Sequence, residues 1–204
     1  PAIAQAYELA AERYEALTAV DPERFRAEYA AVLKRLSDAL AGLDRFEASV
    51  DAARECARIY EKLAERRPME HLPQLAEALH SLAVRCIPLR RFRQALDASR
   101  RSTQAYRDLA EREPGTHLPH LATSLGELAK LHAVAQQNRR AASVQAESVA
   151  LYRELAKRDP ATFRPKLAAS LALQGGCLLD AGQGEKALQA ARESLDIHRD
   201  LARE

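Results

Sequence analysis

The stretch that decides the fold is residues 152–197, YRELAKRDPATFRPKLAASLALQGGCLLDAGQGEKALQAARESLDI, because the rest of the chain repeats it. Tyr14, Tyr60, Tyr106 and Tyr152 are each 46 residues apart and account for four of the six tyrosines. Seven of the nine prolines fall into two further columns with the same period, namely Pro22, Pro68, Pro114 and Pro160, and Pro73, Pro119 and Pro165. A fixed period of this length indicates an array of stacked supersecondary units. We therefore divide the chain into units 14–59, 60–105, 106–151 and 152–197, with partial units at both ends.

Within each unit, apolar residues recur at the spacing of an α-helix. One stripe runs from Leu75 to Cys86 and a second from Phe92 to Tyr106, with turn signals between such stripes. In the first unit the pattern predicts a helix near 25–41 and a longer helix near 46–66. Proline fits the first turn of a helix, where its missing N–H would have no partner. On that basis the Pro73 column is expected to mark the beginnings of the first helices to within a few residues.

Small residues occupy matching columns on both helices of each unit. Their side chains allow two helix backbones to approach closely, and a bulky replacement would overpack the contact at a cost of roughly 1–3 kcal/mol. The sequence therefore predicts antiparallel helix pairs that share a seam of leucines and small residues. The three small columns are Ser37, Ala83, Ala129 and Gly175; Ser49, Ala95, Ala141 and Ala187; and Ala10, Cys56, Ser102, Ser148 and Ser194.

Composition argues against several other classes of protein. The formal net charge of +2 is too small to favour nucleic acid or an anionic membrane as a partner. The three cysteines, Cys56, Cys86 and Cys177, lie far apart without a CxxC pair, so neither a disulfide framework nor a zinc site is expected. No apolar run approaches the ~20 residues that a membrane span requires. We expect a cytoplasmic protein.

The columns resemble the tetratricopeptide repeat family. The fourth unit matches that pattern best, through Leu171, Gly175, Leu178, Gly182, Ala187 and Ser194. The unit of 46 residues is longer than the family's usual 34, and Asp44, Arg90 and Gln136 stand where the fourth unit has its turn glycine, Gly182. Long units of this kind are similar to those of kinesin light chains and of tetratricopeptide tracts in high-GC bacteria.

The resemblance implies an all-α, right-handed α-solenoid of about four and a half units, forming a single domain over residues 1–204. It also implies a concave groove lined by the first helices, which binds a protein or peptide. The candidate groove residues that carry over from the family pattern are Lys34, Asp38, Glu77, His80, Val84, His120, Thr123, Lys130 and Lys166.

The residues that suggest chemistry have simpler explanations. His117 and His120 are three residues apart, but His117 shares a column with Phe25 and Phe163, which favours packing over metal binding. His132 occupies a core column and is expected to be a buried histidine with one hydrogen-bond partner. No base is placed near Cys56 or Cys86 to activate a nucleophile. We therefore expect no enzyme activity, no catalytic residue, no metal and no cofactor.

Three functions remain open on the sequence. The leading one is a scaffold that binds an extended segment or helix of another protein. The alternatives are a regulatory or sensor arm of a larger multidomain protein, such as a transcription regulator or signalling ATPase, and a purely architectural spacer. Both termini interrupt the pattern within a second helix without a polar capping helix. We therefore expect a segment of a longer repeat protein, or end-to-end self-association through the uncapped termini.

Overall fold

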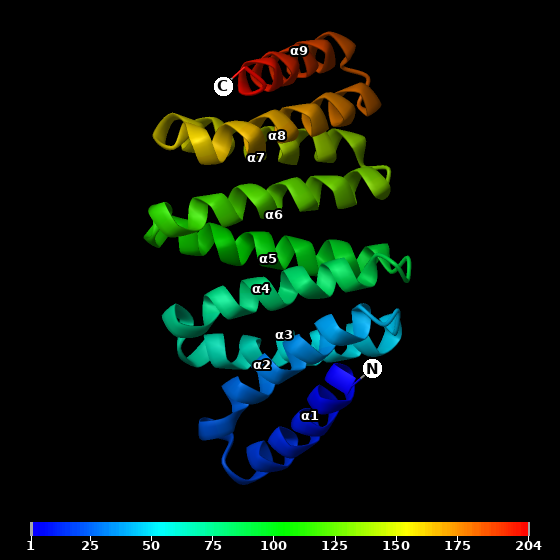
Figure 1. Ribbon diagram of the computed structural model, residues 1–204, viewed down its shortest axis with the longest axis vertical. Coiled ribbons are helices and arrows are strands. Elements are labelled where there is room, and N and C mark those ends of the chain that lie inside the picture. The colour runs from blue at the N-terminus through cyan, green and yellow to red at the C-terminus, as the bar shows by residue number, and fades with distance from the viewer. Residues whose placement is uncertain (1, 204) are drawn as a thin grey trace. The chain divides into compact units, whose positions relative to one another are not determined.

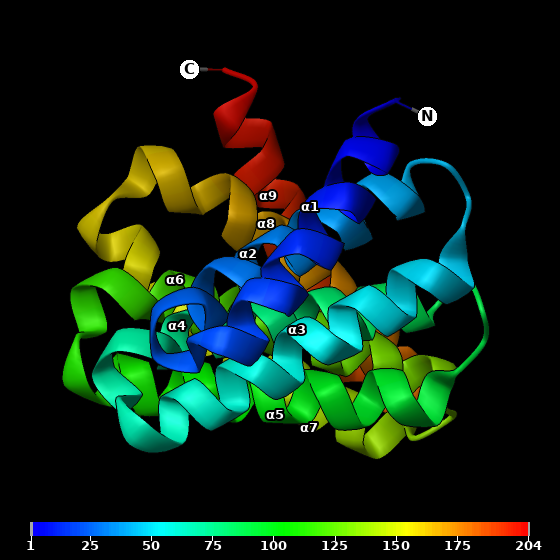
Figure 2. The ribbon, with the colours of Figure 1, turned by 90° about the horizontal axis from the view of Figure 1, so that it is seen from below.

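The computed structural model describes residues 2–203, and over these residues its regular structure is helical throughout (Figures 1 and 2). Consecutive helices pack against one another within each part of the chain. None of the described helices combines the length and the apolar character needed to cross a membrane. The helices are α1 (Ala2–Val20), α2 (Pro22–Ala41), α3 (Phe46–Arg66), α4 (Pro68–Cys86), α5 (Phe92–Arg112), α6 (Pro114–Val134), α7 (Asn138–Arg158), α8 (Pro160–Asp180) and α9 (Gly184–Leu201).

The chain divides into two compact units, with the boundary between Ala105 and Tyr106. This boundary lies within α5 and coincides with the start of the third sequence repeat. The N-terminal unit contains α1 to α4 and the first part of α5, and the C-terminal unit contains the rest of α5 and α6 to α9. The all-α repeat architecture is confirmed, while the single domain over residues 1–204 and the right-handed winding stay predictions.

The predicted helix pair of the first unit matches α2 and α3, which end at Ala41 and Arg66 as expected. The predicted helix beginnings at the Pro73 column were wrong. The first helices begin at the other proline column, so Pro73, Pro119 and Pro165 lie inside α4, α6 and α8. The physical reason is that the earlier prolines occupy the first helical position, where no N–H is needed. Asp21 and Asp159 cap two of these helices by accepting the N–H groups of Arg24 and Thr162 at 3.2 Å.

The turn between the two helices of each unit contains one residue in the left-handed conformation. These residues are Asp44, Arg90, Gln136 and Gly182, with φ of 57°, 54°, 57° and 76°. The column in which the fourth unit has its glycine is therefore the column that needs positive φ. In the second and third units, Arg90 and Gln136 hold this conformation against the steric contact of their Cβ atoms, which costs roughly 1–2 kcal/mol.

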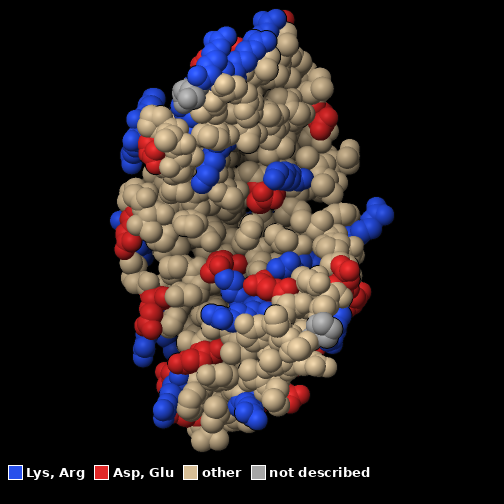
Figure 3. Space-filling model, in the orientation of Figure 1, with Lys and Arg blue, Asp and Glu red and all other residues tan. Residues whose placement is uncertain are grey.

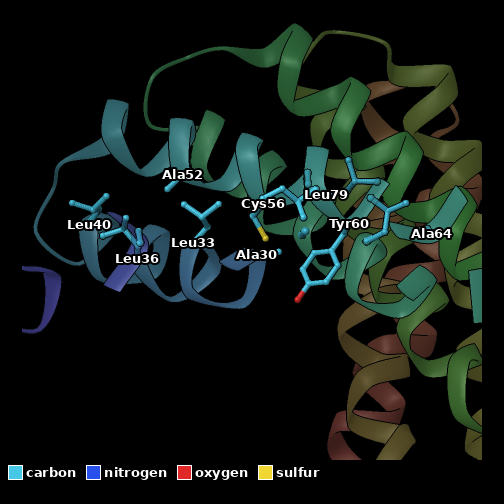
Figure 4. Close-up of a cluster of buried hydrophobic side chains, with 14 of the residues drawn as sticks. Ala30, Leu33, Leu36, Leu40, Ala52, Cys56, Tyr60, Ala64 and Leu79 are labelled. Atoms are coloured by element: carbon cyan, nitrogen blue, oxygen red, sulfur yellow. The ribbon is translucent and has the colours of Figure 1, made fainter. Parts of the chain in front are cut away.

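The hydrophobic core follows the predicted seam. Leu33, Leu79, Leu125 and Leu171 share one column and are exposed by 5%, 2%, 2% and 0%. In Figure 4, the leucines of α2 face the small residues Ala52 and Cys56 of α3, and the aromatic ring of Tyr60 belongs to the same cluster. The seam of leucines and small residues is confirmed.

Serine hydroxyl groups bind the backbone across the seam. Ser102, Ser148 and Ser194 donate to the carbonyl oxygens of Ala76, Ala122 and Ala168 at 2.8, 2.7 and 2.7 Å. Each alanine is fully buried, with 0% exposure. In the first 46-residue repeat Cys56 replaces this serine. There Ser37 and Ser49 instead donate to each other's carbonyl oxygens at 2.9 and 2.8 Å. The two helix backbones therefore lie close enough for a serine hydroxyl on one helix to donate to a carbonyl oxygen of the other.

Leu125→Ala is expected to lower the free energy of unfolding by about 2–5 kcal/mol, because it leaves a cavity in the core of the C-terminal unit. Urea denaturation followed by circular dichroism measures the change. Leu179→Ala is the matched control, since Leu179 is 65% exposed and its truncation should change stability by no more than about 0.5 kcal/mol. Equal losses in the two variants would contradict the buried seam.

Arg90→Gly is expected to raise the free energy of unfolding by about 1 kcal/mol, because glycine adopts positive φ without the Cβ contact. The reverse exchange, Gly182→Arg, should lower it by a similar amount. Thermal and urea denaturation of both variants check the pair. A loss of stability in Arg90→Gly would show that the arginine side chain, rather than the turn geometry, decides this position.

Candidate ligand-binding groove

In the N-terminal unit, the three charged groove candidates form ion pairs between helices α2 and α4. Lys34 on α2 forms an ion pair with Glu77 on α4, and Arg85 on α4 donates to Asp38 on α2 at 2.7 Å. His80 is half-buried and Val84 is 37% exposed. Two ion pairs therefore connect the two first helices and neutralise the charges on this face. Figure 3 shows acidic side chains next to basic ones on the face it displays.

In the C-terminal unit, the predicted residues have different surroundings. The ring of His120 stacks on that of Tyr106 at a centroid distance of 5.6 Å. The hydroxyl of Thr123 donates to the carbonyl oxygen of Pro119 at 2.9 Å and lies 2.8 Å from the hydroxyl of Tyr152. Because its single proton goes to Pro119, Thr123 accepts from Tyr152.

The two predicted lysines of this unit differ in their partners. Lys130 is paired with Glu127 on the same helix at 2.8 Å. Lys166 lies 5.2 Å from the centre of the Phe163 ring and has no ion-pair partner among residues 2–203. Its exposed ammonium group is therefore not neutralised by an ion pair among the described residues.

Three predicted residues, Thr123, Lys130 and Lys166, line one cavity with a volume of about 230 Å³. The cavity lies between α6 and α8, with α7 beneath it. Gly126 on α6 forms part of its wall, in the column where the preceding units have Lys34 and His80. The absence of a side chain there leaves room above α7. His120 is not among the lining residues.

Gln145 on α7 also lines this cavity and was missed by the sequence interpretation. Its side-chain amide nitrogen donates to the carbonyl oxygen and the hydroxyl of Ser170, both at 2.8 Å. Because a carbonyl oxygen can only accept, these contacts fix the orientation of the amide. The amide oxygen is buried and has no hydrogen-bond partner among the described residues. A Cβ built on Gly126 would lie 3.8 Å from that oxygen.

A sequence signal for Gln145 existed. Its column contains Tyr7, Ala53, Ser99 and Ala191, so Gln145 is a polar, hydrogen-bonding exception in a column of mostly small residues. Gln145 is fully buried, with 0% exposure. Packing of the helix pair alone does not explain a long polar side chain at this position.

The remaining residues that suggested chemistry are placed as follows. The rings of His117 and His120 are 6.2 Å apart, and His117 lies 3.9 Å from Glu113. His132 is buried, with Nδ1 2.8 Å from the amide oxygen of Gln137. Burial raises the pKa of the Cys56 thiol to about 12 and also raises the pKa values of Cys86 and Cys177. A raised pKa keeps a thiol protonated and weakly nucleophilic at neutral pH.

No protein-family model and no curated protein match the sequence. Solved structures do match it. MamA superposes with a TM-score of 0.62 at 12% identity, over 97% of this chain and 92% of that chain. A putative kinesin light chain with nearly identical TPR-like repeats, from Podosopora anserina, gives 0.70 at 18% identity over 97% and 90%. RapI gives 0.71 at 15% identity, over 95% of this chain and 47% of that chain.

These likenesses agree with the repeat, the antiparallel helix pairs and the seam of small residues described above. The identities are below the level at which a ligand or a partner could be transferred. The described part of the chain has the helical-repeat fold of the tetratricopeptide type.

Proposed function

We propose that this chain is a protein-interaction scaffold whose C-terminal unit binds an extended, acidic peptide segment across α6 and α8. The observation that carries the proposal is the cavity above Gln145, where a buried amide oxygen without a partner lies beside an open wall at Gly126. An unsatisfied buried acceptor of this kind costs about 1–3 kcal/mol. A donor brought by a ligand would recover that free energy.

The donor that fits is a peptide N–H group. The cavity of about 230 Å³ is smaller than the ~300–1,000 Å³ typical of small-molecule sites, so it suits one side chain and its flanking backbone. The oxygen of Gln145 is covered in the free chain. The ligand therefore meets it through a small rotation of the Gln145 side chain toward the cavity, on the side that Gly126 leaves open.

The charge of this site favours an acidic ligand. Two lysines, Lys130 and Lys166, line the cavity, and Glu127 is the single acidic residue of its lining. Glu127 forms an ion pair with Lys130. Lys166 thus remains to pair with a carboxylate of the ligand. One of the solved structures of this fold, a Rap conjugation gene regulator, is in complex with the Phr* peptide and superposes with a TM-score of 0.56 at 15% identity. That structure supports peptide binding as a use of the fold.

The N-terminal unit suits a structural role better. The pairs Lys34–Glu77 and Arg85–Asp38 hold α2 to α4 and leave that face electrically balanced. An architectural spacer predicts that no substitution on the first helices affects binding. A regulatory arm of a larger protein is compatible with peptide binding, since the bound segment would then belong to the regulated domain.

Lys166→Glu is expected to weaken binding of acidic peptides about three- to tenfold, because an attractive charge becomes a repulsive one. The ligands are selected from a displayed library of random 12-residue peptides, and fluorescence anisotropy of the synthetic peptides measures affinity. Lys157→Glu is the matched control, because Lys157 is exposed on α7 and does not line the cavity. A library that yields no binder, or equal losses in both variants, would contradict the proposed site.

Gly126→Leu is expected to abolish peptide binding by filling the cavity. The same exchange should raise the free energy of unfolding by up to about 1 kcal/mol, because glycine is a poor helix former. Gly176→Leu on α8 is its control: nothing lies within 4 Å of a Cβ built there, and it does not line the cavity. Peptide affinity that survives Gly126→Leu would move the binding site to another face.

A further inference from the structure

A second cavity in the C-terminal unit lies between the second helices α7 and α9, with α8 behind them. Its volume is about 430 Å³, and it shares none of its lining residues with the cavity above Gln145. It lies on the side of the second helices, whereas the proposed peptide site lies on the side of the first helices. This cavity is therefore separate from the proposed peptide site.

The cavity exists because three columns change their residue type here. Gln174 stands where the other units have Leu36, Leu82 and Leu128. Ala142 stands in the column of Val50, Leu96 and Leu188, and Ala146 in that of Arg54, Arg100 and Arg192. Each change removes bulk or introduces an amide at a position that is otherwise filled by an apolar or long side chain. Gln174, Ala142 and Ala146 all line the cavity.

The lining carries an excess of positive charge. Arg153 forms a two-point ion pair with Glu193, at 3.2 and 2.5 Å, which leaves Arg139 and Lys186 in excess. The guanidinium group of Arg139 has no ion-pair partner in the part of the chain that the structure describes. Lys186 donates to the amide oxygen of Gln183 at 3.1 Å. Two uncompensated cations beside one cavity favour a ligand with two negative charges.

Hydrogen-bonding groups accompany this charge. The amides of Gln174 and Gln189 offer both donors and acceptors, and the hydroxyl of Ser143 does the same. The volume of about 430 Å³ falls within the ~300–1,000 Å³ range of small-molecule sites. A phosphate monoester carries about −1.5 to −2 charges at neutral pH and three strong acceptor oxygens. Its organic part would occupy the amide-lined portion.

We propose that the cavity between α7, α8 and α9 binds a small organic phosphate monoester. Arg139 and Lys186 hold the phosphate group, and Gln174 and Gln189 bind the hydroxyl or amide-like groups of the organic part. This would give the C-terminal unit a small-molecule site on the side opposite to its peptide site.

Isothermal titration calorimetry with AMP, ribose 5-phosphate and glucose 6-phosphate tests the site, with adenosine, ribose and inorganic phosphate as comparison ligands. At least one monoester is expected to bind with a Kd of about 1 mM or tighter. Its unphosphorylated counterpart and inorganic phosphate are expected to bind at least about tenfold more weakly, since each supplies only part of the contacts. If no monoester binds more tightly than about 10 mM, or if inorganic phosphate binds as well as the esters, the proposal is overturned.

Two sets of variants locate the binding. Arg139→Gln should weaken the monoester about tenfold by removing a charge-assisted contact. Arg93→Gln is its control, since Arg93 is the equivalent residue of the second unit and causes the same change in net charge. The double variant Ala142→Leu with Gln174→Leu fills the cavity with residues that other units carry, so circular dichroism should show a folded chain that no longer binds. Equal effects of Arg139→Gln and Arg93→Gln, or binding that survives in the folded double variant, would overturn the proposal.

Discussion

The close contact between the two helices of each unit is the constraint on which the rest of the structure depends. A serine hydroxyl of the second helix can reach a carbonyl oxygen of the first helix only if the residues between the backbones are small. Ser148 and Ala122 meet this condition, as do Ser194 and Ala168. The hydrogen bond satisfies the buried hydroxyl, and the alanine leaves no bulk to separate the helices. The serine–alanine pair recurs in the second, third and fourth repeats, and Ser37 and Ser49 bridge the helices of the first repeat instead. This regular close contact brings the leucine columns into register.

This constraint separates the positions that build the fold from the positions that are free to vary. The two cavities that we propose as binding sites lie where a residue departs from its column without disturbing the serine–alanine contact. Gly126 replaces the lysine and histidine of earlier repeats beside the proposed peptide site, and Gln174 replaces a leucine beside the proposed phosphate site. A repeat protein acquires a site by giving up packing at one position of one unit, since its stability is nearly a sum over neighbouring contacts.

The sequence predicted the helix pairs and their seam well, because the period of 46 residues supplies several independent observations of each column. It misplaced the beginnings of the first helices because two proline columns compete, and only the structure shows that Pro68, rather than Pro73, occupies the first helical position. The candidate groove residues Thr123, Lys130 and Lys166 line one cavity, and their part in binding stays a prediction. The sequence did not predict that Lys34 pairs with Glu77 or that Asp38 pairs with Arg85. These ion pairs join α2 to α4 and depend on side-chain rotamers, which the repeat pattern does not determine.

Gln145 is a buried departure from its repeat column, and an inspection of exposed residues alone does not find it. A search for groove residues looks at variable, solvent-facing columns, and Gln145 is fully buried. In a seam column, however, variation is itself costly, because a larger side chain must find both space and hydrogen-bond partners. Ser170 provides partners for the amide nitrogen, whereas the amide oxygen is left without one among the described residues. This buried, half-satisfied amide supports the proposed peptide site more strongly than the charge differences on the exposed columns do, because solvent tolerates those differences at little cost.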